Sequence, residues 1–214
     1  MQGFAKAKVA GWLRAMRRDR RGVSILEFAL ALPIFLILGL YGTEVAYMSM
    51  INMEVSEIAT SVADNSSRIG QTDNSSVTPT VTETQVASVM TGGLYQGNSF
   101  NFEAHGRIIL SSLEINSKSQ QYIHWQRCSG DLTVASAYGV AGTIETNGMG
   151  RTGHMVMAPT GMAVMYVEVY YDYQPLFGTM FVKSSRFERE AALLVRDDRN
   201  LTPGVTGGNS TTSC

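Results

Sequence analysis

Two residues near the N-terminus, Gly22 and Glu27, have types and a spacing that suggest chemistry. They follow a basic run at residues 17–21 and stand at the start of a long apolar stretch. A carboxylate inside a membrane segment is energetically costly, and it is therefore a functional residue by default. The basic run, the glycine and the acid at this offset predict a proteolytic processing site.

Cleavage after Gly22 would give Val23 a new α-amino group, whose reference pKa is ~8. Val23 and Glu27 are four residues apart, so a helix would place this amine one turn from the carboxylate. The amine can pair with Glu27 of its own chain or with Glu27 of a neighbouring copy. In lipid such an ion pair has few competitors, so we interpret Glu27 as a residue that sets the stagger between packed helices. The alternative is a carboxylate that reaches the lipid headgroups.

Other patterns typical of active sites or metal sites are weak. Gly148–Gly153 matches G-x-G-x-x-G, but Pro159 and Gly161 follow before a helix can form, so we interpret it as a glycine-rich loop. The histidines lie far apart, and His124 is expected at the surface or satisfied in the core. The clustered methionines are interpreted as core residues rather than copper ligands: Met149, Met155, Met157, Met162 and Met165. We therefore predict no enzyme, cofactor, metal site, nucleic-acid partner or small-molecule substrate.

Charge divides the sequence at Gly22. Residues 1–22 contain seven basic residues and one acidic residue, whereas the remainder has ten basic and 17 acidic residues. Under the positive-inside rule, the basic leader stays in the cytoplasm and the rest is exported. Residues 23–43 contain one charge, Glu27, and at ~1.5 Å per residue they span ~30 Å, the thickness of a bilayer's hydrocarbon core. We predict a retained membrane helix rather than a cleaved secretory signal. Signal cleavage after Ala46 would leave Glu44 at a position that requires a small neutral residue.

The helical pattern continues beyond the membrane segment. Apolar residues recur at spacings of three and four at Met48, Ile51, Val55, Ile58 and Val62, which is the pattern of a helix with one apolar stripe. We predict one helix over residues 23–64. Pro33 falls inside it, and membrane helices tolerate proline.

Residues 65–200 are predicted to form a mainly antiparallel β domain. A polar loop comes first, then a short helix at residues 83–90 with Thr82 as its N-cap and Gly92-Gly93 as its stop signal. Strands are predicted at residues 107–115, 121–128 and 163–173, and residues 179–195 are read as one or two strands or partly helix. Residues 201–214 form a Gly/Ser/Thr-rich tail. The predicted fold class is α+β, a long N-terminal membrane helix leading to a small antiparallel sheet.

The two cysteines, Cys128 and Cys214, both fall in the part that we predict to be exported. An oxidising compartment permits a disulfide between them. It would close a loop of 86 residues and stabilise the fold by at most ~4–5 kcal/mol in the chain-entropy model. Two unpaired thiols are the alternative.

The N-terminal stretch resembles type IV prepilins and pseudopilins, and among them the TadE-like minor pseudopilins of the tight-adherence pilus. The similarity covers about residues 17–60. It rests on Arg20-Arg21-Gly22, Glu27-Phe28-Ala29-Leu30, Pro33, the Leu/Ile run to Gly42, and Glu44. Beyond this stretch the resemblance is one of architecture alone.

The resemblance implies cleavage after Gly22 by a prepilin peptidase. It implies roles in helix packing and assembly for Glu27, Phe28, Pro33 and Glu44, with other pilin or pseudopilin subunits, inner-membrane platform proteins and the lipid bilayer as partners. It also implies a bacterial inner-membrane location, with a pilin-like β-rich head in the periplasm or, after assembly, on a cell-surface pilus. Val23 stands where many type IV pilins have phenylalanine, so N-methylation is not implied. The head is far larger than that of this system's major pilin, which favours a minor role at the start, tip or base of a pilus.

Two other functions remain open at the level of sequence. One is a signal-anchored periplasmic domain that binds a ligand or an envelope partner and does not polymerise. The other is an exported enzyme, for which the sequence shows no recognisable catalytic cluster.

Overall fold

The computed structural model describes residues 22–70, 78–196, 198–207 and 214. The predicted leader lies outside the described residues except for Gly22, and so do residues 208–213 of the predicted tail. Contacts divide the chain into two compact units, Met1–Ala46 and Tyr47–Cys214. The second unit thus begins within the long helix, whose C-terminal part supplies residues to the core of the β domain.

The first long element is helix α2, Val23–Ser67, which continues through Pro33. Among the described residues it is the one helix long and apolar enough to cross a membrane. Its C-terminal part carries the predicted apolar stripe, where four residues are at most 1% exposed: Ile51, Val55, Ile58 and Val62. Met48 packs against this core and is partly buried. The prediction that the helix extends beyond residue 43 with one apolar stripe is confirmed.

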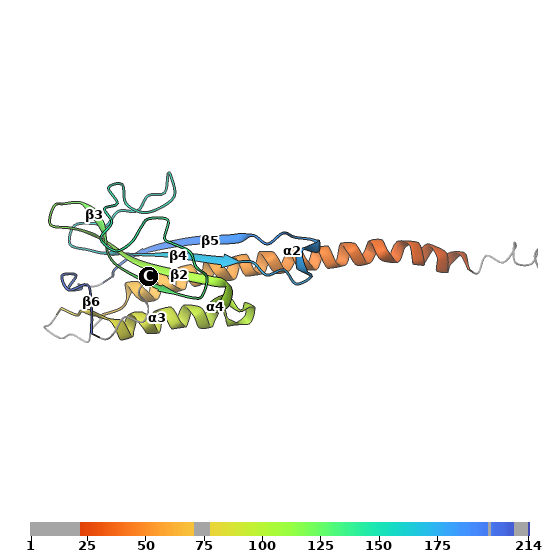
Figure 1. Ribbon diagram of the computed structural model, residues 1–214, viewed down its shortest axis with the longest axis horizontal. Helices are drawn as coiled ribbons and strands as arrows, with labels where there is room; N and C mark the ends of the chain where they lie inside the picture. The colour runs from red at the N-terminus through yellow and green to blue at the C-terminus, as the bar shows by residue number, and fades with distance from the viewer. Residues whose placement is uncertain (1–21, 71–77, 197, 208–213) are drawn as a thin grey trace, which may run out of the picture. The chain divides into compact units, whose positions relative to one another are not determined.

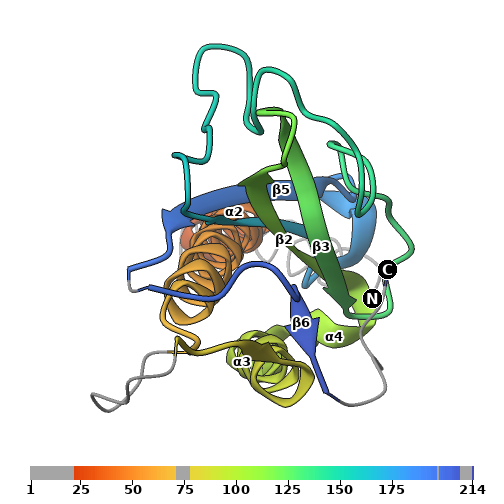
Figure 2. The ribbon, with the colours of Figure 1, turned by 90° about the vertical axis from the view of Figure 1, so that its left-hand side faces the viewer.

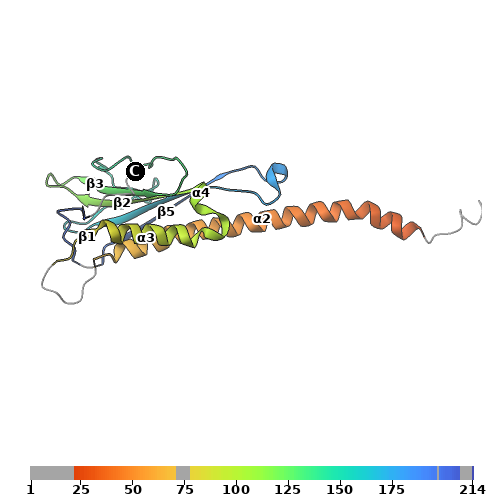
Figure 3. The same ribbon diagram turned by 60° about the horizontal axis from the view of Figure 1, so that its bottom comes forward.

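Helix α3 spans Glu83–Gln96 and begins with the predicted N-cap, Thr82. The Gln85 backbone N–H donates to Thr82 Oγ1 over 3.3 Å, and Thr82 N–H donates to Gln85 Oε1 over 3.0 Å, a reciprocal capping box. The predicted stop at Gly92-Gly93 is wrong, because α3 runs through both glycines. A Cβ on Gly93 would lie 2.6 Å from Val62 and 2.8 Å from Ile108. Gly93 is therefore needed for the close approach of α3 to α2, which run side by side (Figure 3).

Four strands form an antiparallel sheet in the order β3-β2-β4-β5. They are β2 (Gly106–Ile115), β3 (Gln121–Ser129), β4 (Val164–Asp172) and β5 (Arg186–Leu194). The first three confirm the predicted strands. Residues 186–194, which the sequence left between strand and helix, form β5, and the preceding segment contains the 3-10 turn η2 (Gly178–Met180).

Short elements complete the β domain. The two-residue strands β1 (Val81–Thr82) and β6 (Val205–Thr206) pair in parallel. The 3-10 turn η1 (Asn98–Phe100) and helix α4 (Phe102–His105) connect α3 to β2. Cys128 at the end of β3 forms a disulfide with Cys214, with their Cα atoms 5.0 Å apart, which is the first of the two alternatives that the sequence left open.

Both faces of the sheet are covered (Figures 1 and 2). One face packs on the C-terminal part of α2 and on α3, through side chains such as Ile108, Val167 and Phe187. Residues 130–163, which connect β3 to β4, cover the other face and contact Ile123 and Tyr166. This double burial explains why the sequence of β4 is apolar almost throughout instead of alternating.

Strand β5 is the edge strand of the sheet and runs alongside α2 in the same direction. Arg189, near its start, donates a hydrogen bond to Asn52, and Arg196, just after its end, forms an ion pair with Asp64 at 2.7 Å. The strand and this part of α2 thus advance together along the β domain.

Candidate functional site

Gly22 and Glu27 lie at the start of α2. Gly22 directly precedes the helix, and its carbonyl accepts a hydrogen bond from the Leu26 N–H over 3.1 Å. Val23 and Glu27 are one turn apart and solvent-exposed, as is Phe28. The glycine therefore joins the helix to the preceding chain at an accessible peptide bond, and the acid lies one turn beyond it.

The two remaining helix residues singled out by the sequence differ in their surroundings. Pro33 is exposed within the helix, while Glu44 is fully buried. Near it, Thr43 Oγ1 donates to the Gly39 carbonyl over 2.9 Å. From Val23 to Tyr41 the large apolar side chains are exposed on all sides of the helix, so this part of α2 is apolar around its whole circumference rather than amphipathic.

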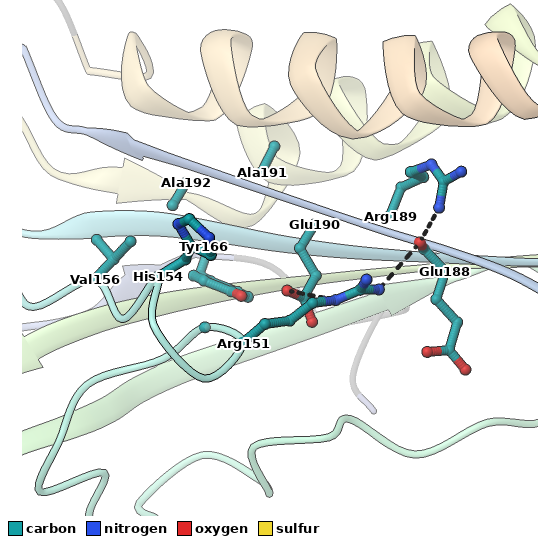
Figure 4. A pocket seen from close by; sticks show the side chains of 10 residues that line it. Arg151, His154, Val156, Tyr166, Glu188, Arg189, Glu190, Ala191 and Ala192 are labelled. Carbon is teal, nitrogen blue, oxygen red and sulfur yellow. Dashed lines mark hydrogen bonds and ion pairs between the residues drawn. The ribbon is translucent and has the colours of Figure 1, made fainter.

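The β domain contains a groove along β5, shown in Figure 4. It has a volume of about 440 Å³, with Glu188–Ala192 of β5 on one side and residues of the loop 150–156 on the other. Arg151 extends from this loop to β5. Its Nη2 donates to the Glu188 carbonyl over 3.4 Å, and its Nε lies 3.6 Å from the Glu190 carboxylate.

The side of β5 that faces the groove is the open edge of the sheet. The Tyr173 N–H donates to the Ser185 carbonyl, and the Val195 N–H donates to the Ala163 carbonyl, so odd-numbered residues of β5 pair with β4. In an antiparallel ladder, successive residues of a strand direct their N–H and C=O groups alternately toward the paired strand and away from it. The N–H and C=O groups of Glu188, Glu190 and Ala192 therefore point outward.

The glycine motif at residues 148–153 builds the wall of this groove. Gly148, Gly150 and Gly153 have φ angles of 80°, 137° and 90°, in the region that favours glycine. Met149 and Val156 exchange backbone hydrogen bonds of 3.0 and 2.8 Å across the loop. The sequence interpretation of a glycine-rich loop agrees with this geometry, which positions Arg151 against β5.

Two carboxylates face each other beneath the 130–163 segment. Glu168 of β4 lies directly opposite Glu190 of β5, an arrangement that is unfavourable when both are ionised. Glu168 is 1% exposed and accepts hydrogen bonds from the Ala137 N–H at 2.8 Å and the Ser136 and Tyr170 hydroxyls at 2.5 and 2.8 Å. Burial raises the pKa of the Glu168 carboxyl, and the hydrogen bonds oppose that rise.

The hydroxyl of Tyr138 connects Glu190 to this covering segment. It donates to Glu190 over 3.0 Å and lies 3.2 Å from the Tyr166 hydroxyl, which donates to it. Burial raises the pKa of both Tyr138 and Tyr166 above that of free tyrosine. The covering segment is thus held on the sheet by neutral hydroxyl donors to carboxylates.

A second cavity of about 540 Å³ includes His124 and Glu114 in its lining. His124 Nδ1 lies 2.9 Å from Glu114 Oε2, and the Ser112 hydroxyl donates to Glu114 Oε1 over 2.6 Å. The hydrogen bond to Glu114 raises the pKa of His124, against the opposing effect of its partial burial. The expectation of a satisfied histidine is confirmed.

The methionine cluster is only partly a core feature. Met149 and Met165 are fully buried, as predicted, but Met155, Met157 and Met162 are 42%, 54% and 37% exposed. The prediction is wrong for these three because they lie in the covering segment, whose outer surface faces solvent. Within the described parts of the chain, no group of three or more His, Cys, Asp or Glu residues is placed to hold a metal.

Sequence reasoning did not find the β5 groove or the Glu168–Glu190 pair. Residues 186–190 read Arg-Phe-Glu-Arg-Glu, a charged stretch at the start of an uncertain segment. Glu188 and Glu190 would lie on the same face of a strand, and this was the available signal. The loop 150–156, which forms the other side of the groove, lies more than thirty residues away in sequence, so no local pattern connects the two. Comparison of the chain with protein-family profiles, curated proteins and solved structures found no match.

Proposed function

We propose that this chain is a minor pilin or pseudopilin of a tight-adherence type IV pilus, TadE-like in its N-terminus. In this proposal a prepilin peptidase cleaves after Gly22, and the mature protein takes part in initiation or at the tip or base of the pilus. The observation that carries it is the position of Gly22 immediately before α2, with Glu27 exposed one turn beyond the peptide bond to be cut.

The surroundings of Glu27 support its role in assembly. It is the single charge among the residues of 23–43, where large apolar side chains are exposed around the helix. Within a bilayer, a carboxylate without a partner is costly. The α-amine of Val23 in the mature protein, on the same or a neighbouring chain, is the group that would offset this cost. The ion pair would fix the stagger between subunits.

The topology follows from the same residues. The basic leader would remain in the cytoplasm, the segment 23–43 would cross the inner membrane once, and the β domain would lie in the periplasm. The Cys128–Cys214 disulfide supports an oxidising compartment for this domain. A pilin-like arrangement, in which the helix packs among other subunits with the head outside, is part of the proposal.

The first experiment determines the mature N-terminus by mass spectrometry of membrane-extracted protein. We expect Val23 as the first residue in cells that contain a prepilin peptidase, and retention of the leader when the peptidase gene is deleted. A Gly22→Ala variant is expected to block processing. Any other N-terminus in peptidase-positive cells would contradict the processing step.

The second experiment separates assembly from processing. Glu27→Ala is expected to be cleaved and inserted but not to support piliation, because the register contact is lost. Glu57→Ala, an exposed acid of the same helix in the β-domain unit, is the matched control and is expected to support piliation. Normal piliation with Glu27→Ala would refute the role of this carboxylate.

A signal-anchored periplasmic binding domain is the second candidate function. The 540 Å³ cavity beside Tyr122 and His124, whose rings lie 5.3 Å apart, is the observation that favours it. This function requires neither cleavage nor Glu27. A retained leader and a functional Glu27→Ala variant would therefore select it over the pilin.

A further inference from the structure

We propose that the open edge of β5 is a docking site for an extended segment of another polypeptide, which adds a fifth strand to the sheet. The segment would pair antiparallel with Glu188–Ala192 and carry basic side chains opposite Glu188 and Glu190. This inference does not depend on processing at Gly22, and it assigns a partner-binding surface to the β domain itself.

The first support is the unused hydrogen-bonding capacity of the edge. Glu188, Glu190 and Ala192 direct main-chain groups away from β4 along a strand length of ~13 Å, at ~3.3 Å per residue. Among the described residues, two side chains donate to this row, Arg151 and Arg189, and both do so at the Glu188 carbonyl, over 3.4 and 2.6 Å. Only another strand presents donors and acceptors at the matching repeat, which is the basis of recognition by strand addition.

The second support is the shape of the site. Open edges in soluble proteins are commonly shortened, bulged or covered. Here the edge strand has nine residues, and the loop 150–156 stands away from it and leaves a groove of about 440 Å³. Ala192, which lines this groove and lies on the same side of β5 as Glu188 and Glu190, has a small side chain that leaves room for a neighbouring chain.

The third support is charge, which selects the occupant. Glu188 is exposed and Glu190 is partly exposed, and both point to the same face of the sheet. If the β5 strands of two copies paired antiparallel with Glu190 opposite Glu190, or with Glu188 opposite Glu188, like charges would face each other directly. Such a contact destabilises an antiparallel pair. A second copy is therefore a poor occupant, whereas a strand with lysine or arginine on that face is complementary.

Arg151 acts as a competitor for this site. Its guanidinium occupies the Glu188 carbonyl and neutralises part of the charge of Glu190, so it must move aside when a strand adds. The side chain is largely exposed and its contact to the carbonyl is long at 3.4 Å, which makes displacement easy. Removal of Arg151 should therefore strengthen docking.

The test uses the full chain in detergent micelles and a fluorescein-labelled peptide of five Lys-Val repeats. In an antiparallel pair, residues opposite Glu188 and Glu190 both face them with their side chains and exchange main-chain hydrogen bonds with them. The lysine amides must therefore point at β5. We expect the peptide with N-methylated lysine amides to bind at least about tenfold more weakly, the loss of ~1.4 kcal/mol or more. The peptide with N-methylated valine amides should bind nearly as well as the parent.

Two variants test the charge and the competitor. Glu188→Lys should weaken binding of the Lys-Val peptide by about tenfold and strengthen binding of a Glu-Val peptide. Glu57→Lys makes the same charge change away from the groove and should alter the affinity for neither peptide. Arg151→Ala should tighten binding of the Lys-Val peptide. Hydrogen-exchange mass spectrometry should show slower exchange across residues 186–194 in the complex.

Three results would overturn the proposal. The first is equal binding of all three Lys-Val peptides, which would show a purely electrostatic contact. The second is unchanged amide exchange in β5 at saturating peptide. The third is dimerisation of the protein alone through β5, seen in sedimentation and abolished by Ala192→Pro, which would assign the edge to a second copy.

Discussion

Gly93 of α3 lies so close to Val62 of α2 that a Cβ on the glycine would be 2.6 Å from the valine Cγ2. The neighbouring Gly92 is in the same helix, but a Cβ there would meet nothing within 4 Å. Two adjacent glycines in one helix therefore have opposite roles. One permits helix contact, and the other only lowers helix propensity.

The first prediction concerns this pair of glycines. Gly93→Ala should lower the free energy of unfolding by ~1–3 kcal/mol, because the added methyl group overpacks a rigid contact between α2, α3 and β2. Gly92→Ala should instead raise it by ~0.5–1 kcal/mol, because alanine is the better residue in an exposed helix interior. Urea unfolding followed by circular dichroism measures both. Equal effects of the two substitutions would contradict the close approach.

The second prediction concerns Glu168. Its pKa in the folded protein is raised by burial, so folding favours the protonated form. Its contribution to the free energy of unfolding is fully present below the unfolded pKa of 4.5 and is lost as pH rises through the folded pKa. The difference in free energy of unfolding between wild type and Glu168→Gln should therefore change over the pH range from the unfolded pKa to the folded pKa of Glu168. Glu188→Gln makes the same substitution at an exposed position of β5 and serves as the control for the loss of one carboxylate.

The third prediction concerns His124, whose pKa is raised by its hydrogen bond to Glu114. Its contribution to stability is fully present below the unfolded pKa of 6.5 and is lost as pH rises through the folded pKa. Titration by NMR should give a pKa above 6.5 for His124, and Glu114→Gln should lower it. An unchanged His124 pKa in that variant would contradict the ion pair.

The fourth prediction concerns the Cys128–Cys214 disulfide, which closes a loop with a sequence separation of 86 residues. Its reduction should lower the free energy of unfolding by up to ~4–5 kcal/mol in the chain-entropy model. Thermal unfolding with and without a reductant measures the change. The double variant Cys128→Ser/Cys214→Ser is the control, since its unfolding midpoint should not respond to reductant.

Periodic local patterns predicted the main elements well. The stripe from Met48 to Val62 identified the amphipathic part of α2, and Thr82 was correctly predicted as the N-cap of α3. These features depend on residues three or four apart, whose relation is set by helix geometry alone. The prediction for Gly92-Gly93 failed because the role of Gly93 depends on Val62 and Ile108, which are distant in sequence.

The groove was beyond sequence reasoning for the same physical reason. It requires Arg151 to meet Glu188 and Glu190, and that meeting depends on how residues 130–163 cross the sheet. By contrast, Gly22, Glu27 and the apolar run are contiguous, so their relation along α2 follows directly from the rise of a helix. What such residues do with a peptidase or a neighbouring subunit stays a prediction.

The parallel course of β5 and the C-terminal part of α2 has a mechanical consequence. Contacts between them are distributed along both elements, from Arg189 with Asn52 to Arg196 with Asp64. A pull on α2 at Tyr47, directed along its axis, would load these contacts together in shear instead of peeling them apart one by one. The β domain is therefore arranged to resist tension applied along this part of the helix.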